Sequence, residues 1–190
     1  STTHNIERER HVAFSNSIFV IGTRLMTDRN SGIRDFGDLA GKTVAVTAGT
    51  TSERLLRIFN ERTTARLHIV SPKDHGESFQ LLESRQVQAF MMDDALLYGE
   101  RAKAQRPDDW VVVGGPMSSE AYGCMMRRGD TGFKQVVDAA LAKLMVSGEA
   151  LKIYNKWFQR PIPPKGLNLN WPPSESLLEL YRSPNDKSLE

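Results

Sequence analysis

The sequence predicts an α/β fold. Three observations support this: a globular composition, short apolar runs alternating with helical segments, and helices alone toward the C-terminus. Of the 190 residues, 39% are hydrophobic and 25% are charged, with a formal net charge of +2. These values exclude collagen-like, coiled-coil and wholly disordered chains. No apolar run reaches the ~20 residues that cross a bilayer, and the dispersed Lys and Arg disfavour nucleic-acid binding.

Strands are predicted where short apolar runs rich in β-branched residues stand between turn residues. These runs occupy residues 13–27, 43–47, 67–70, 87–92, 110–113 and 121–126. Strands alternate with helices between residues 43 and 113, which predicts a parallel sheet.

Helices are predicted where apolar side chains recur at helical spacing. They occupy a short turn at 36–39, a segment from residue 52, a segment from 74 or 78 to 84, and residues 94–104, 133–146 and 149–158. Asp94 directly follows a strand, so we expect it to cap the next helix. The Pro- and Asn-rich residues 161–189 are predicted to be mostly irregular.

Two loops follow predicted parallel strands, and ligands of open α/β sheets bind beyond the carboxyl ends of the strands. Residues 48–52 offer main-chain amides and hydroxyls at a helix N-terminus, which attract anions. Asp93 and Asp94 follow the other strand, and a carboxylate there suits an ammonium group. The pair of loops matches a zwitterion, of which an α-amino acid is the simplest example.

Several stretches carry a resemblance to a known family. The chain opens with STTHNIER and continues with AFS at 13–15, TAGTTSERLL at 47–56, KDHGESFQLLES at 73–84, AFMMDDALL at 89–97, EAYGCMMRRGD at 120–130 and NKWFQRPIPPKGLNLN at 155–170. Together they resemble the periplasmic amino-acid-binding proteins of ABC transporters, solute-binding protein family 3. The similarity is greatest to members that bind glutamate or aspartate, and it covers essentially the whole chain.

The resemblance implies a type II periplasmic-binding-protein fold with a complete lobe 2 and an incomplete lobe 1. Residues 1–21 would hold part of lobe 1 and the first hinge strand, 22–121 lobe 2, and 122–190 the second hinge strand, the C-terminal helices of lobe 1 and an irregular tail. The hinge would lie near 19–23 and 119–123, and closure about it is expected. Family chains have a further segment before residue 1, so we interpret the chain as a fragment with weakened binding. Exposed sheet edges then predict a dimer or an exchange of elements.

The resemblance also implies ligand contacts. Arg8 would clamp the ligand α-carboxylate with its planar guanidinium; alternatively it is one exposed arginine among several. Ser1 and Thr3 would hydrogen-bond the ligand backbone. Thr50 and Thr51 would complete the α-carboxylate site, although ordinary helix capping is the alternative.

Asp93 matches the carboxylate that takes the ligand ammonium, with Asp94 as its capping neighbour. His75 would lie near the side-chain carboxylate of glutamate or aspartate, where a neutral imidazole donates one hydrogen bond and a protonated one adds charge. The alternative is a surface histidine at a helix start.

Other residues of reactive types are not assigned to a site. The remaining histidines show no paired metal spacing, so no metal site is predicted. Cys124 is expected to be a free, half-buried thiol, and Trp157 and Phe158 are expected to pack in the core.

The predicted function is periplasmic binding of L-glutamate or L-aspartate for delivery to an ABC transporter permease, without catalysis or a cofactor. A cyclohexadienyl or arogenate dehydratase-like enzyme is one alternative, because it shares the fold. No acid–base pair stands beyond the predicted ligand contacts, which disfavours it. A ligand-binding sensor domain on the same fold is the other alternative.

Overall fold

The computed structural model describes residues 2–189, and the chain divides into two units. Unit 1 holds residues 1–21 and 119–190, and unit 2 holds residues 22–118. The chain passes from one unit to the other twice, within strand β3 (Phe19–Asp28) and just before strand β8 (Ser119–Gly123). None of the described helices is long and apolar enough to cross a membrane.

The sheet of unit 2 is built from β3 and four further strands. These are β4 (Thr43–Val46), β5 (His68–Val70), β6 (Ala89–Asp93) and β7 (Trp110–Val113). The strand order is β3-β6-β4-β5, with β7 paired to β3. Strand β4 runs parallel to β5 and β6, as the alternation of strands and helices predicted.

The four strands between residues 43 and 113 all share one direction, but the sheet also contains β3, which lies outside that range. Strand β3 runs antiparallel to both β6 and β7. It lies between these two strands although it precedes both in sequence. Alternation of strands and helices describes only consecutive elements, so it could not show where a strand from the start of the chain inserts.

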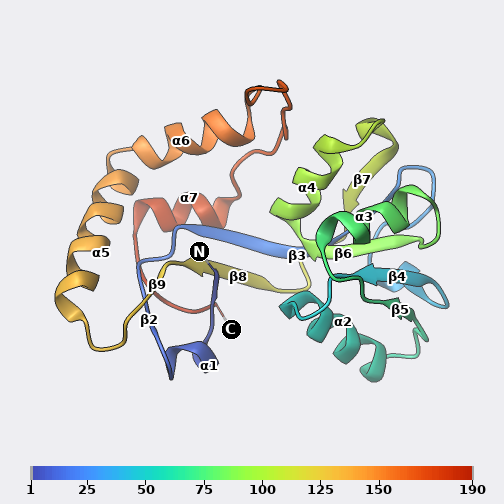
Figure 1. The fold of residues 1–190 in the computed structure, drawn as a ribbon, viewed down its shortest axis with the longest axis horizontal. Coiled ribbons are helices and arrows are strands. Elements are labelled where there is room, and N and C mark those ends of the chain that lie inside the picture. Colours follow the sequence, from blue (N-terminus) through green and yellow to red (C-terminus); the bar gives the residue numbers. More distant parts are fainter. Residues whose placement is uncertain (1, 190) are drawn as a thin grey trace. The chain divides into compact units, whose positions relative to one another are not determined.

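Helices cover both faces of this sheet (Figure 1). Alternate strand residues point to opposite faces, and Leu25 and Met26 of β3 belong to different core clusters. Leu25 packs with Leu56 of α2 (Thr51–Arg62), and with the 3₁₀ turn η1 (Phe36–Leu39). Met26 packs with α3 (His75–Glu83) and α4 (Asp94–Lys103), beside the short η2 (Pro107–Asp109). Each fully buried apolar side chain contributes about 1.5–3 kcal/mol.

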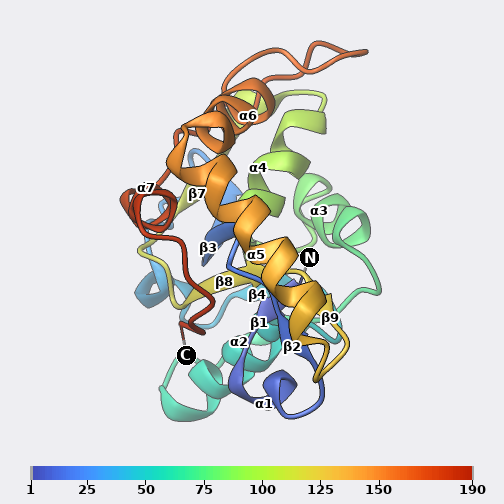
Figure 2. The same cartoon turned by 90° about the vertical axis from the view of Figure 1, so that its left-hand side faces the viewer.

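Unit 1 combines short antiparallel strands with helices. Strand β1 (Thr2–His4) pairs with β8, and β2 (Ala13–Phe14) pairs with β9 (Met125–Met126). The helices are α1 (Ile6–Glu9), α5 (Thr131–Val146), α6 (Glu149–Phe158) and α7 (Glu175–Arg182), and α5 packs with both α6 and α7 (Figure 2). The buried centre is made of Tyr154, Leu177 and Leu180.

Two further predictions from the sequence need correction, and a third needs an addition. Residues 13–27 form two strands, β2 and β3, because Ser15 and Ser17 make hydrogen bonds outside a continuous ladder. The tail is mostly irregular as predicted, but it also includes α7, where Ser174 caps the helix and two leucines are buried. Trp157 is 43% exposed, whereas Phe158 packs on Phe19 as expected.

Candidate functional site

The carboxyl ends of β4 and β6 lie side by side in unit 2, because these strands are parallel neighbours. The loop after β4 leads into α2, and β6 ends on Asp93. Ser52 Oγ donates a hydrogen bond to Asp93 Oδ1 at 3.2 Å. Ser52 is fully buried, and Asp93 is 5% exposed. Asp93 therefore stands at the strand end where the sequence placed an ammonium-binding carboxylate.

Thr50 and Thr51 have different environments although they are adjacent. Thr50 Oγ1 donates to the Thr47 carbonyl oxygen at 2.7 Å and accepts from the Glu53 N–H at 3.1 Å. Its proton is thus used in capping α2, which was the alternative interpretation. Thr51 is half-buried, and its side chain makes no hydrogen bond within residues 2–189. Its hydroxyl is therefore the one available to an anion.

His75 begins α3 and lies beside the loop that follows β4. Asp74 caps the helix by accepting from the Glu77 N–H. His75 Nδ1 lies 2.8 Å from Thr47 Oγ1, which in turn lies 3.0 Å from Ser78 Oγ. His75 is half-buried and anchored by hydrogen bonding, unlike a freely exposed surface histidine.

The structure thus gathers Thr51, His75 and Asp93 around the ends of β4 and β6. It adds three buried hydroxyls that the sequence analysis did not select. Ser52 stands in the loop already singled out and Thr47 directly precedes it, so their position was a usable signal. Ser78 has no such signal, because its role depends on which strand α3 packs against. The added residues are Thr47, Ser52 and Ser78.

Asp94 does not cap α4 as the sequence predicted, because it is the first residue of the helix, and Asp93 holds the N-cap position without a side-chain capping bond to the helix. Asp94 Oδ1 accepts from the main-chain N–H of Gly22 at 3.2 Å and of Ala95 at 2.8 Å. Burial raises the pKa of Asp94 to about 6, against the opposing effects of these two N–H donors and of Arg24. The neighbouring charge of Asp93 adds a smaller upward effect on the same pKa.

In unit 1, Arg8 lies on α1 and bonds to β1. Its Nη1 donates to Thr2 Oγ1 at 2.9 Å and to the Thr3 carbonyl oxygen at 2.7 Å. These bonds hold one end of the guanidinium, and Thr2 is a supporting residue that the sequence analysis did not select. Thr3 Oγ1 donates a hydrogen bond to Glu120 Oε2 at 2.7 Å, so toward a ligand this hydroxyl could act only as an acceptor. Ser1 lies outside the described residues.

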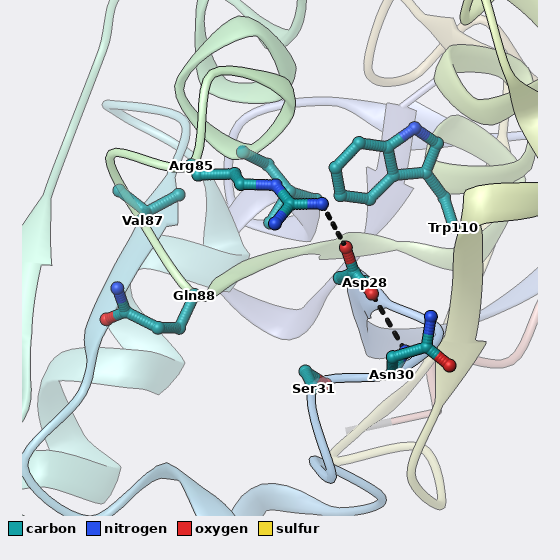
Figure 3. Close-up of a pocket in the computed structure, with 8 residues that line it drawn as sticks. Asp28, Asn30, Ser31, Arg85, Val87, Gln88 and Trp110 are labelled. Atoms are coloured by element: carbon teal, nitrogen blue, oxygen red, sulfur yellow. Dashed lines mark hydrogen bonds and ion pairs between the residues drawn. The ribbon is translucent and has the colours of Figure 1, made fainter.

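A pocket of about 350 Å³ lies elsewhere in unit 2 (Figure 3). It is lined in part by Asp28, Gln88 and Trp110, with an ion pair of 3.2 Å between Arg85 and Asp28. Asp28 ends β3, and Gln88 immediately precedes β6, so the pocket is at the end of β6 opposite to Asp93. None of the predicted site residues lines it. Among residues 2–189, no three His, Cys, Asp or Glu side chains are grouped to hold a metal ion.

Comparisons with known proteins give close relatives over the whole chain. The L-glutamate/L-aspartate-binding protein of Pseudomonas aeruginosa is 60% identical over 190 residues, which is 100% of this chain and 63% of that protein. The glutamate/aspartate import solute-binding protein of Escherichia coli is 54% identical over 189 residues, with the same two coverages. The chain thus spans 63% of the length of these relatives.

Solved structures of similar fold are also found. A ligand-binding core from Nostoc punctiforme in complex with L-glutamate has a TM-score of 0.68 and 27% identity, covering 82% of this chain and 69% of that one. An ancestral arginine-binding protein bound to arginine has a TM-score of 0.70 and 29% identity, covering 83% and 69%. These neighbours confirm the predicted α/β fold of the type II periplasmic binding proteins. The model of the bacterial extracellular solute-binding proteins, family 3, matches residues 1–160, and the chain therefore belongs to this family.

Proposed function

We propose that this chain serves to capture L-glutamate or L-aspartate in the periplasm and to deliver it to the permease of an ABC importer, without catalysing a reaction. The observation that carries the proposal is the 60% identity, over the whole chain, to a relative named for binding these two amino acids. The polar residues at the ends of β4 and β6 support it, because their chemistry suits an acidic amino acid.

In unit 2, each proposed contact has a chemical reason. Asp93 would pair with the ligand ammonium, and Ser52 orients its carboxylate. The free hydroxyl of Thr51 would donate to the α-carboxylate, while Thr50 would act through the cap of α2. His75 would meet the side-chain carboxylate, which must be neutralised because burying a lone anion is costly.

In unit 1, Arg8 would pair with the α-carboxylate through its remaining N–H groups, because Nη1 is held by β1. Thr3 would contribute only an acceptor, since its proton goes to Glu120. The proposed role of Ser1 follows the resemblance alone.

No observation favours the dehydratase alternative. Such an enzyme needs a carboxyl that keeps its proton near neutral pH and can give it to a substrate. Asp94 has the raised pKa, but its Oδ1 accepts two main-chain hydrogen bonds. We therefore assign it a structural role.

The experiment replaces the matching part of the Pseudomonas aeruginosa relative with this chain and titrates the chimaera by calorimetry. We expect saturable binding of L-glutamate and L-aspartate. The unmodified relative is the positive control. An Asp93→Asn chimaera is the matched negative control, because the ligand ammonium loses its charged partner while Ser52 keeps an acceptor. A folded chimaera that binds neither acid would refute the proposal.

The dimer or exchange of elements between two copies of the chain, expected from the sequence, also stays a prediction. Unit 1 exposes apolar side chains on α5 and α6 on which a second copy could pack, namely Phe133, Val136, Leu144, Val146, Ile153 and Trp157. Sedimentation velocity of the 190-residue chain over a wide concentration range tests it. A sedimentation coefficient that stays at the monomer value would argue against the second copy.

A further inference from the structure

A short relay of hydroxyl groups in unit 2 ends on His75. Ser78 Oγ lies 3.0 Å from the Asp74 carbonyl oxygen, and a carbonyl can only accept. Thr47 Oγ1 lies 3.0 Å from Ser78 Oγ, where either hydroxyl can donate. Both contacts of Ser78 are hydrogen bonds only when its single proton goes to Asp74 and Thr47 donates to Ser78. The oxygen of Thr47 is then left as an acceptor.

His75 Nδ1 lies 2.8 Å from this oxygen. Because the proton of Thr47 is already used, the hydrogen bond requires a proton on Nδ1. Thr47 is 3% exposed and Ser78 is fully buried, so solvent offers neither hydroxyl another partner. We infer that Thr47 and Ser78 act as positioning residues that hold His75 with its proton on Nδ1, which makes Nε2 an acceptor in the neutral ring and a donor only in the imidazolium.

Nε2 is the nitrogen that His75 offers to a ligand. Within residues 2–189, the buried side-chain nitrogen and oxygen atoms without a hydrogen-bond partner are His4 Nδ1 and Ser17 Oγ. His75 Nε2 also makes no hydrogen bond in the described structure, but it is not one of these buried atoms. Nε2 is therefore exposed to solvent. A ligand can therefore reach it as well.

The inference sharpens, and rests on, the proposed function where it concerns the ligand. A carboxylate only accepts hydrogen bonds, whereas a primary amide also donates them. A glutamate or aspartate side chain can thus bond to Nε2 only when His75 is doubly protonated. A glutamine side chain can bond to the neutral ring. Capture of the acidic ligand is then coupled to uptake of a proton, and the same histidine discriminates acid from amide by its charge.

The charged side chains around α3 within the described residues form no ion pair with His75, so proton uptake by His75 is coupled to the ligand. Helix α3 packs with β4, β6 and α4, and β4 carries no charged residue. The charged groups on these elements and at the cap of α3 are Asp74, which caps α3; Glu77, paired with Lys73; Glu83, at the far end of α3; Asp93, bonded to Ser52; Asp94, bonded to Gly22; Glu100, paired with Lys103; and Arg101, bonded to Pro107. The titratable phenol of Tyr98 also lies on α4.

The tautomer is tested on the 190-residue chain without ligand. Two-bond ¹H–¹⁵N correlation spectra at about pH 8, where an imidazole in water is mostly neutral, should show His75 protonated on Nδ1. Thr47→Val should abolish this pattern and shift the ring toward the Nε2–H form. Thr47→Ser should preserve it, because it keeps the hydroxyl. Ser84→Ala is the matched control, since its hydroxyl bonds the end of the same helix.

An Nε2–H signal for His75 in the unmodified chain would overturn the inference. Because this spectrum needs no ligand, it decides the tautomer even if the proposed function fails. If Thr47→Val does not fold, Ser78→Ala serves instead, since it releases the Thr47 proton and should weaken the preference for Nδ1–H.

The coupling is tested on the chimaera, by calorimetry in buffers of different ionisation enthalpy. At about pH 8, L-glutamate binding should take up about one proton per ligand, and its affinity should fall by up to about tenfold for each further pH unit. His75→Gln should abolish this uptake, because a neutral amide donates to a carboxylate. Binding of L-glutamate without proton uptake would refute the coupling. Absence of any binding would count against the proposed function, while the spectra would still stand.

Discussion

The carboxylate of Asp94 accepts a hydrogen bond from the main-chain N–H of Gly22 at 3.2 Å. This bond ties the first turn of α4 to the residue at which β3 enters unit 2. It spans 72 positions of sequence. The carboxylate that makes it is half-buried, and its pKa is raised to about 6 mainly by that burial.

Asp94 should make stability depend on pH. Its pKa is about 6 in the folded chain and ordinarily 3.8, so the unfolded chain loses this proton first as pH rises. Stability should fall as pH rises from about 4 through 6, by on the order of 1–3 kcal/mol at most. Asp94→Asn should remove this loss and keep the acceptor for Gly22. Urea denaturation across this pH range measures it.

The control for that experiment is Asp108→Asn, which changes an exposed carboxylate of the same unit. It should leave the pH dependence of the unfolding free energy unchanged. An Asp94→Asn profile parallel to the unmodified chain would contradict the assignment of the raised pKa.

Gly22 should not tolerate a side chain. A Cβ at this position would lie 2.6 Å from Pro116 Cβ, which is a clash with an atom bonded directly to the main chain. Gly22→Ala should therefore destabilise unit 2 by about 1–3 kcal/mol. Gly115→Ala is the matched control, because its Cβ would meet nothing within 4 Å. Equal unfolding free energies for the two variants would refute the prediction.

Substitution of Thr50 should mainly lower the stability of the chain, whereas substitution of Thr51 should mainly weaken ligand binding. Thr50→Ala removes the cap of α2 and should cost about 1 kcal/mol of unfolding free energy. Thr51→Ala should change stability by less than about 0.5 kcal/mol. In the chimaera, Thr51→Ala should weaken L-glutamate binding about tenfold or more, as expected for a hydrogen bond to a charged group. Denaturation and calorimetry together check the pair, and unchanged affinity in Thr51→Ala would remove it from the proposed site.

Arg8 should be needed for its shape as well as its charge. Arg8→Lys keeps the charge but loses the planar fork that pairs with a carboxylate and bonds to β1. In the chimaera, L-glutamate affinity should fall at least about tenfold. Arg10→Lys, at an exposed neighbouring position, should bind normally. Equal affinities of the two variants would place Arg8 outside the site.

Much of unit 2 could be predicted from local patterns. The apolar run at 43–47 became β4 in a parallel sheet, and the helices α2 and α3 begin close to the expected residues. These elements were accessible because burial on one face leaves a periodic trace in neighbouring residues. The same reasoning overlooked α7, since two buried leucines in a Pro-rich tail make too short a pattern.

Local patterning was enough to select the carboxylates of Asp93 and Asp94, because they follow a strand end where ligands bind, whereas His75 was selected from the family resemblance. Folding alone decided how these groups are protonated and held. Thr47 and Ser78 orient His75 from two different elements, and Gly22 engages Asp94 across 72 positions. A hydroxyl proton goes to whichever acceptor folding brings within about 3 Å, and a carboxyl pKa follows the burial that packing creates. Neither quantity is encoded in the order of neighbouring residues, so only the tertiary structure could reveal them.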